Sequence, residues 1–278
     1  MITSVALRTT RAESGFQMRM LARDPVAVLG AASTPLINLP LLYSINRHTR
    51  VLVADVLGTR GAAVVDGGTG GVSFGAYLTP ALAAFAVAGA CMFGLVVRTV
   101  TAREEGVLKR VRSTPMSPGA WLAGNVATSV VLALVVVAAT FTLGVALYGA
   151  AVVPRLLPAA LLTVVAGVAC FCSLGLALAT VIPSRDAAVA AASSVLITLG
   201  FTSATFFSPA ISPAWMRTTA SYLPLEPFTT ALFSATNPAT PGLGFRGPEL
   251  ARLAVWTVVT AAVALRYFRW EPARPRRR

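Results

Sequence analysis

The chain contains six apolar runs separated by polar segments, and most of these runs have the length of a membrane-spanning helix. A helix needs about 20 mostly apolar residues to cross the hydrocarbon core of a bilayer. Proline follows a hydroxyl residue at Thr79–Pro80 and at Ser117–Pro118, a pattern that predicts the starts of the second and third helices. The predicted spans are residues 25–45, 77–97, a stretch within 118–150, 157–182, 187–207 and 253–265.

The last run is the shortest, because Arg252 and Arg266 flank it. Both side chains are long enough to extend outward to water, so neighbouring apolar residues can lengthen the helix. Residues 46–76 are rich in glycine and predict an irregular loop. Residues 208–248 combine aromatic side chains with many prolines, which predicts short re-entrant or interfacial helices. The whole pattern predicts an all-α polytopic membrane protein.

Composition and charge support this prediction. Of the 278 residues, 56% are hydrophobic and 12% are charged, and the mean hydropathy is +0.74. A soluble domain of this length would carry about twice this share of charge. The net charge of +13 could indicate a nucleic-acid partner, but the sequence has no nucleic-acid motif and no interleaving of basic and aromatic residues. The basic residues instead gather on one side of the predicted spans, which places both termini on the cytoplasmic side of the cell membrane.

The sequence holds no recognisable source of energy for transport. None of the ten acidic residues lies in a predicted span, which argues against a proton-driven carrier, although backbone carbonyls could still bind sodium. No G-x-x-x-x-G-K-[ST] loop is present, so the chain does not bind ATP in the P-loop manner by itself. Three candidates remain: a passive channel, a structural subunit, or a membrane half driven by a separate motor.

Enzyme chemistry has little support in the sequence. Residues 71–75 formally match G-x-S-x-G, with Ser73 at the nucleophile position. The only histidine, His48, precedes Ser73, which reverses the order found in hydrolases, and a flexible glycine loop is the favoured interpretation. The three cysteines lie in apolar runs and are expected to be buried, without a disulfide framework or a metal site; they are Cys91, Cys170 and Cys172.

The segment TAREEGVLKRVRSTP, residues 101–115, is densely charged although apolar runs flank it. Thr101 and Glu104 match a capping box, which predicts a helix start. Glu105 and Lys109 have the spacing and the order of a helical ion pair. The pattern predicts a short amphipathic helix on the cytoplasmic side, with an apolar face formed by Val107, Leu108 and Val111. A solvated loop that only fixes the topology is the alternative.

The residues REEGVLKRVRSTPMSPGAWLAGN (103–125) resemble the loop after the second span in type 2 ABC exporter permeases, the daunorubicin-resistance permease group. The pattern of that group is roughly R-E-x-G-T-L-x-R-L-x-x-T-P, and Val107 stands where threonine is frequent. The similarity continues, in order and spacing, in ARDPVAVLGAASTPL (22–36), VSFGAYLTPALAAF (72–85), SPAWMRTTASYLPLEPFTTALF (212–233) and YFRWEP (267–272).

The resemblance implies a partner and a division of the chain. Such permeases have six helices per half, pair as dimers or pseudo-dimers, and bind a separately encoded cytoplasmic ATPase. ATP and Mg²⁺ would be held by that ATPase, and this chain would hold no cofactor or metal. The parts implied are an N-terminal cytoplasmic interfacial helix at 1–24, a single transmembrane domain at 25–270 and a basic cytoplasmic tail at 271–278.

The resemblance also suggests which residues matter. The helix after the second span would be the coupling helix, and the predicted ATPase-coupling interface is Arg103, Glu104, Glu105, Gly106, Lys109, Arg110 and Arg112. A second coupling turn is predicted at Ser184, Arg185 and Asp186. Candidates for the substrate path between the two halves, for which helix packing is the alternative, are Phe201, Thr205 and Phe206.

Together these observations predict the membrane permease subunit of an ATP-driven exporter, without enzymatic activity of its own. It would move an amphipathic drug-like, lipid or glycan-type substrate outward. Motor closure on ATP would move the coupling helix and switch the pathway from inward-open to outward-open. The first alternative is a non-transporting assembly or anchoring subunit, and the second is a membrane hydrolase that uses Ser73.

Overall fold

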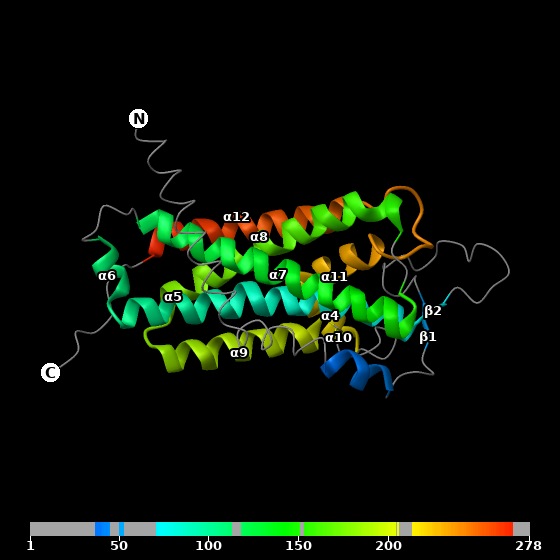
Figure 1. Ribbon diagram of the computed structural model, residues 1–278, viewed down its shortest axis with the longest axis horizontal. Helices are drawn as coiled ribbons and strands as arrows, with labels where there is room; N and C mark the ends of the chain where they lie inside the picture. The colour runs from blue at the N-terminus through cyan, green and yellow to red at the C-terminus, as the bar shows by residue number, and fades with distance from the viewer. Residues whose placement is uncertain are drawn as a thin grey trace.

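Long helices aligned along one direction form a bundle in the described part of the chain (Figure 1). The computed structural model describes residues 37–44, 50–52, 71–112, 118–150, 153–203, 205 and 213–268. Residues 37–44 are helical, whereas the rest of the predicted first span lies outside the described residues. The predicted interfacial helix at 1–24 and the tail at 271–278 also lie outside them.

The first long helix consists of three consecutive segments, α4 (Phe74–Ala88), the π-helical turn η1 (Gly89–Phe93) and α5 (Gly94–Glu104). It begins before Pro80, which lies inside α4, so the predicted helix start at Thr79–Pro80 was wrong. The Thr79 hydroxyl donates to the Gly75 carbonyl at 2.8 Å, the bond that threonine commonly makes inside a helix.

The long helices run alternately between the two ends of the bundle (Figure 1). After α5 come α6 (Val107–Arg112), α7 (Pro118–Tyr148), η2 (Pro154–Leu156), α8 (Leu157–Val181), α9 (Arg185–Thr202), α10 (Ala214–Tyr222), α11 (Leu225–Ser234) and α12 (Gly247–Tyr267). Helix α7 begins at Pro118, as predicted. The short helices α10 and α11 confirm that residues 208–248 contain short helices instead of a full span.

Two short strands lie at the end of the bundle where α4 begins (Figure 1). Strand β1 (Arg50–Leu52) pairs with β2 (Gly71–Ser73) in antiparallel register, with Val51 opposite Val72. The prediction of an irregular loop over residues 46–76 was therefore wrong near both of its ends. Ser73 ends β2 and the next residue begins α4, so Ser73 lies at a strand-to-helix junction. The sequence still offers this serine no histidine after it, because His48 is the only one.

Four helices in the described part of the chain are long and apolar enough to cross a membrane: Tyr77–Glu104, Trp121–Tyr148, Pro154–Val181 and Gly247–Tyr267. They correspond to the predicted second, third, fourth and sixth spans. Helix α9 has only 18 residues and ends at Thr202, before the predicted end at residue 207, and it is not among the four. A total of six spans stays a prediction, because most of the first lies outside the described residues.

The main core lies where α8 packs against α4, η1, α11 and α12. Phe171 on α8 and Phe228 on α11 are fully buried, with ring centroids 6.0 Å apart. Gly175 lets α8 approach η1 so closely that a Cβ atom there would lie 2.9 Å from the Met92 carbonyl oxygen. Small residues serve this purpose between membrane helices, where close backbone contact replaces the hydrophobic driving force. All three cysteines are buried, as predicted.

Replacing Gly175 by alanine should destabilise the folded protein, because the added Cβ would meet a backbone carbonyl that no side-chain rotation can move. We expect a loss of about 1–3 kcal/mol, measured as a lower unfolding temperature of the detergent-solubilised protein. Gly119→Ala is the matched control, since a Cβ on this α7 residue would meet nothing within 4 Å. Equal unfolding temperatures for the two variants would contradict the close approach of α8 to η1.

Candidate functional site

A turn at residues 105–106 separates α5 from α6 at one end of the bundle (Figure 1). The amides of this turn donate to the carbonyls of Thr101 and Arg103 at 2.9 and 3.2 Å, which completes α5. Gly106 has φ of 71°, a left-handed conformation that commonly ends helices and that glycine adopts without steric cost. The predicted capping box was therefore wrong, because Thr101 and Glu104 lie in the last turn of one helix instead of the first turn of the next.

Helix α6 packs one side chain inward and presents charge outward. Leu108 is buried against Ala102 of α5 and Trp121 of α7, whereas Lys109 and Arg110 are exposed. This arrangement confirms a short amphipathic helix for the side chains that are described. The predicted helical ion pair was wrong, because Glu105 belongs to the turn while Lys109 belongs to α6. The side chains of Val111 and Arg112 lie outside the description.

Arg103 points into the protein, unlike its charged neighbours. The residue is only 4% exposed, and its Nη1 atom donates to the Ala179 carbonyl at 3.0 Å. Its Nη2 atom donates to the Ile182 carbonyl. These carbonyls belong to the C-terminal end of α8, where helix geometry leaves acceptors without helical partners and concentrates partial negative charge. The guanidinium of Arg103 is thus engaged inside this chain and is not part of the exposed surface predicted for the ATPase contact.

Glu104, the next residue, contacts the start of the following helix. Its Oε2 atom accepts a hydrogen bond from the Arg185 amide at 2.8 Å, and the Ser184 hydroxyl accepts one from the Ala187 amide at 3.4 Å. Both acceptors therefore serve the N-terminal end of α9, where amides are free and the helix dipole favours negative charge. Asp186 lies in the same first turn.

Arg103 and Glu104 together hold the α8–α9 connection from both sides, and we call this arrangement the α5 clasp. A cation meets the negative end of α8 and an anion meets the positive end of α9, so both charges complement the helix dipoles. The structure thereby brings the two predicted coupling segments together, the one after α5 and the turn at Ser184–Asp186. Sequence reasoning predicted the two segments, but it did not predict that they touch.

The predicted path residues do not form one surface in the described part of the chain. Phe201 on α9 is 48% exposed, whereas Thr205 is buried and its hydroxyl lies 3.1 Å from that of Ser203. Phe206 lies outside the described residues.

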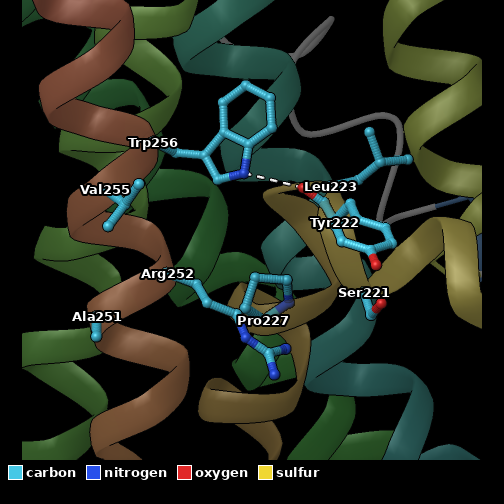
Figure 2. Close-up of a pocket in the computed structure, with 8 residues that line it drawn as sticks. All are labelled: Ser221, Tyr222, Leu223, Pro227, Ala251, Arg252, Val255 and Trp256. Atoms are coloured by element: carbon cyan, nitrogen blue, oxygen red, sulfur yellow. Dashed lines mark hydrogen bonds between the residues drawn. The ribbon is translucent and has the colours of Figure 1, made fainter.

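A cavity of about 520 Å³ beside the N-terminal half of α12 was not predicted from the sequence; we call it the α12 recess (Figure 2). It lies between the α10–α11 connection and the first turns of α12. Its lining residues are Ser221, Tyr222, Leu223, Pro227, Ala251, Arg252, Val255 and Trp256. These residues come from two segments about thirty positions apart, and nothing in the sequence indicates that the segments meet. The aromatic and basic residues near the last apolar run are the sequence features that could have pointed to a site here.

Arg252, which lines the recess, belongs to a group of charged residues. Arg252 Nη1 lies 3.8 Å from Glu226 Oε2, and Arg246 pairs with Glu249 at 2.9 Å. Burial raises the pKa of Glu226 above its ordinary value, with the positive charge of Arg252 opposing the rise. Within the described residues, no group of three or more His, Cys, Asp and Glu side chains lies close enough to hold a metal ion.

The bundle contains several helices of membrane-spanning length and a short amphipathic helix at one end, which is the architecture of a polytopic membrane protein. Residues 14–236 match the family described as ABC-2 type transporter, and the chain belongs to that family. No curated protein matches the chain. Membership makes the chain the transmembrane permease component of an ABC transporter, a transport component whose family partners an ABC ATPase in the membrane. The sequence itself contains no P-loop.

Removing the Arg103 side chain should destabilise the protein although no core methyl group is lost. Arg103→Ala would leave buried acceptors at the end of α8 unpaired, at a cost of about 1–3 kcal/mol in detergent-solubilised protein. Arg110→Ala is the matched control, because this guanidinium is exposed and its bond to the Glu105 carbonyl, at 3.3 Å, faces solvent. We expect the control to shift the free energy of unfolding by less than about 0.5 kcal/mol. Similar unfolding temperatures for both variants would show that the α5 clasp does not stabilise the fold.

Proposed function

We propose that this chain is the permease subunit of an ATP-driven exporter in the cell membrane, similar to the daunorubicin-resistance group. It would move an amphipathic drug-like, lipid or glycan-type molecule outward, driven by a separately encoded ATPase. The observation that carries the proposal is the geometry of α6. This helix stands at the end of the bundle with charged residues exposed, yet its turn and its buried Leu108 attach it to two long helices.

The exposed charges define the proposed ATPase contact. Glu104, Glu105, Lys109 and Arg110 are exposed, and Gly106 forms the turn between the acidic and the basic residues. Acidic and basic side chains on one small protrusion suit electrostatic pairing with a soluble protein surface, which favours correct docking more than raw affinity. In this proposal Arg103 is a positioning residue, because it acts through α8 instead of touching the ATPase.

The α5 clasp supplies a route for movement. A push on α6 would act on α5 through the turn and on α7 through the packing of Leu108 against Trp121. Arg103 and Glu104 would pass the same displacement to the α8–α9 connection. Because helices move as rigid bodies when their ends are held, one contact could reorient four helices together.

The remaining parts of the proposal concern the assembled transporter. Two copies of the chain, or one copy and a related permease, would face each other, with substrate passing between them. Residues 1–24 would form a cytoplasmic interfacial helix, and both termini would be cytoplasmic. Exposed Phe201 on α9, followed by Thr205 and Phe206, would contribute to the path. Support comes from family membership and from the sequence resemblance.

The alternative function is a non-transporting subunit that assembles or anchors other proteins. Such a subunit could also bind an ATPase through α6. It would leave ATP hydrolysis by that ATPase unchanged when the two are reconstituted together, whereas an exporter subunit should change the hydrolysis rate.

Cysteine labelling tests the orientation. Arg110→Cys should react with a membrane-impermeant maleimide only in inside-out vesicles, and Leu243→Cys should react only in right-side-out vesicles, because both positions are exposed at opposite ends of the bundle. The unmodified chain is the control, since its three cysteines are buried. The reverse labelling pattern would place α6 outside and exclude a cytoplasmic ATPase contact there.

A paired substitution tests the coupling role of the turn. Glu105→Ala with Gly106→Ala should abolish ATP-driven export and reduce co-purification of the ABC ATPase by roughly tenfold or more, while membrane insertion is unchanged. The matched control is Gly242→Ala with Leu243→Ala at the other end of the bundle. Gly242 has φ of 68°, close to the 71° of Gly106, and neither glycine has anything within 4 Å of its Cβ position. Unchanged export and ATPase binding in the first pair would refute the coupling assignment.

A further inference from the structure

The α12 recess has the shape and position of a ligand site that the proposed transport function does not use. Its volume of about 520 Å³ lies within the range of small-molecule pockets, roughly 300–1,000 Å³. It lies beside the N-terminal half of α12, and this helix begins in the half of the bundle away from α6 (Figure 1). The proposed orientation places that half toward the outer leaflet.

Arg252 gives the recess a positive charge. Its side chain is 49% exposed, extends from α12 toward Pro227 on α11, and has Glu226 as a counter-ion at 3.8 Å (Figure 2). Arg246 and Glu249 already pair with each other at 2.9 Å, so neither charge is left over. Glu226 Oε2 is buried without a hydrogen-bond partner, so this oxygen cannot reach a ligand in the recess. Burial raises the pKa of Glu226, whereas the positive charge of Arg252 lowers it. The 3.8 Å separation makes this a loose ion pair, so the half-exposed guanidinium still faces the recess.

Two aromatic residues form an apolar wall beside this cation. The Trp256 Nε1 atom donates to the Tyr222 carbonyl at 3.0 Å, which fixes the indole ring across the recess (Figure 2). Because this donor is already used, the ring offers only apolar surface to a ligand. Tyr222 is 74% exposed at the rim. Tryptophan and tyrosine are enriched at the membrane–water boundary, where one side of a molecule is polar and the other apolar.

The apolar side of the recess continues along α12. Val255 lines the recess and is 62% exposed, and the residues one turn further, Val258 and Val259, are 68% and 53% exposed. A side chain or acyl chain leaving the recess would therefore run along an uncovered apolar helix face. The order along α12 is thus cation, aromatic ring and aliphatic face, which is the order of parts in a phospholipid.

We infer that the α12 recess binds the phosphate headgroup of an anionic phospholipid from the outer leaflet. Arg252 holds the phosphate, since a guanidinium offers paired N–H donors that match phosphate oxygens. Trp256 packs on the glycerol region, and the first acyl segment follows Val255 and Val259. The choice of leaflet rests on the proposed orientation, but the site does not depend on ATPase coupling, because none of its residues belongs to α6 or to the α5 clasp.

Native mass spectrometry of the full-length protein in detergent tests this site with phosphatidylglycerol as the probe. Arg252→Gln should weaken phosphatidylglycerol binding roughly tenfold, the loss expected for one charge-assisted contact. Arg266→Gln is the matched control, because it removes an exposed arginine from the opposite end of the same helix. Equal weakening in both variants would mean that lipid senses net charge only, and it would overturn the site.

Further arms make each outcome decisive. The double variant Arg252→Gln with Glu226→Gln removes both partners of the ion pair, so its loss of binding cannot come from a buried unpaired carboxylate. Phosphatidylcholine binding as tight as that of phosphatidylglycerol would contradict the preference for an anionic lipid. Displacement by millimolar inorganic phosphate would reassign the site to free anions. A disulfide between two copies of Tyr222→Cys in native membranes would show that a second chain covers the recess, which would also overturn the inference.

Discussion

The buried guanidinium of Arg103 is the interaction on which the arrangement of this bundle depends. A membrane helix that ends inside a packed protein leaves carbonyls that water cannot reach, and these need partners. Arg103 supplies them for α8, while Glu104 supplies an acceptor for the first amides of α9. Two adjacent residues on α5 therefore fix the positions of two other helices, and the charge order arginine then glutamate suits the order in which those helices end and begin.

Much of the bundle could be predicted from the sequence, because the bilayer thickness sets how long an apolar run must be to cross it. This held for the helices that became α7, α8 and α12, whose apolar runs end at proline or charge. The start of α4 was mispredicted, because Thr79–Pro80 resembles a cap although the helix begins at Phe74. The run that became α9 was predicted too long, since apolar composition alone does not show where a helix ends.

The candidate site was predicted in part. The charged segment was recognised as a helix, but the predicted capping-box residues belong to the end of the preceding helix. The reason is that Gly106 ends α5 by taking a left-handed conformation, which the pattern of charged residues does not reveal. The burial of Arg103 could not be predicted, since its partners are backbone carbonyls of α8, which carry no sequence signal. The α12 recess could not be predicted for a similar reason. Trp256 donates to a backbone carbonyl, and the wall of the recess opposite α12 comes from a segment distant in the sequence.

The π-helical turn η1 sets the rotational phase of everything that follows it in the first long helix. A π-turn takes in one residue more than an α-turn, so residues beyond it are rotated by about 100° relative to an uninterrupted α-helix. Arg103 lies two to three turns beyond η1, so this added rotation contributes to the side of α5 on which it lies. The turn that packs against Gly175 within the bundle thus also influences which side of α5 carries the clasp. The number of residues between 89 and 103 is therefore constrained as well as their identity, because one residue more or fewer would turn Arg103 to another side of the helix.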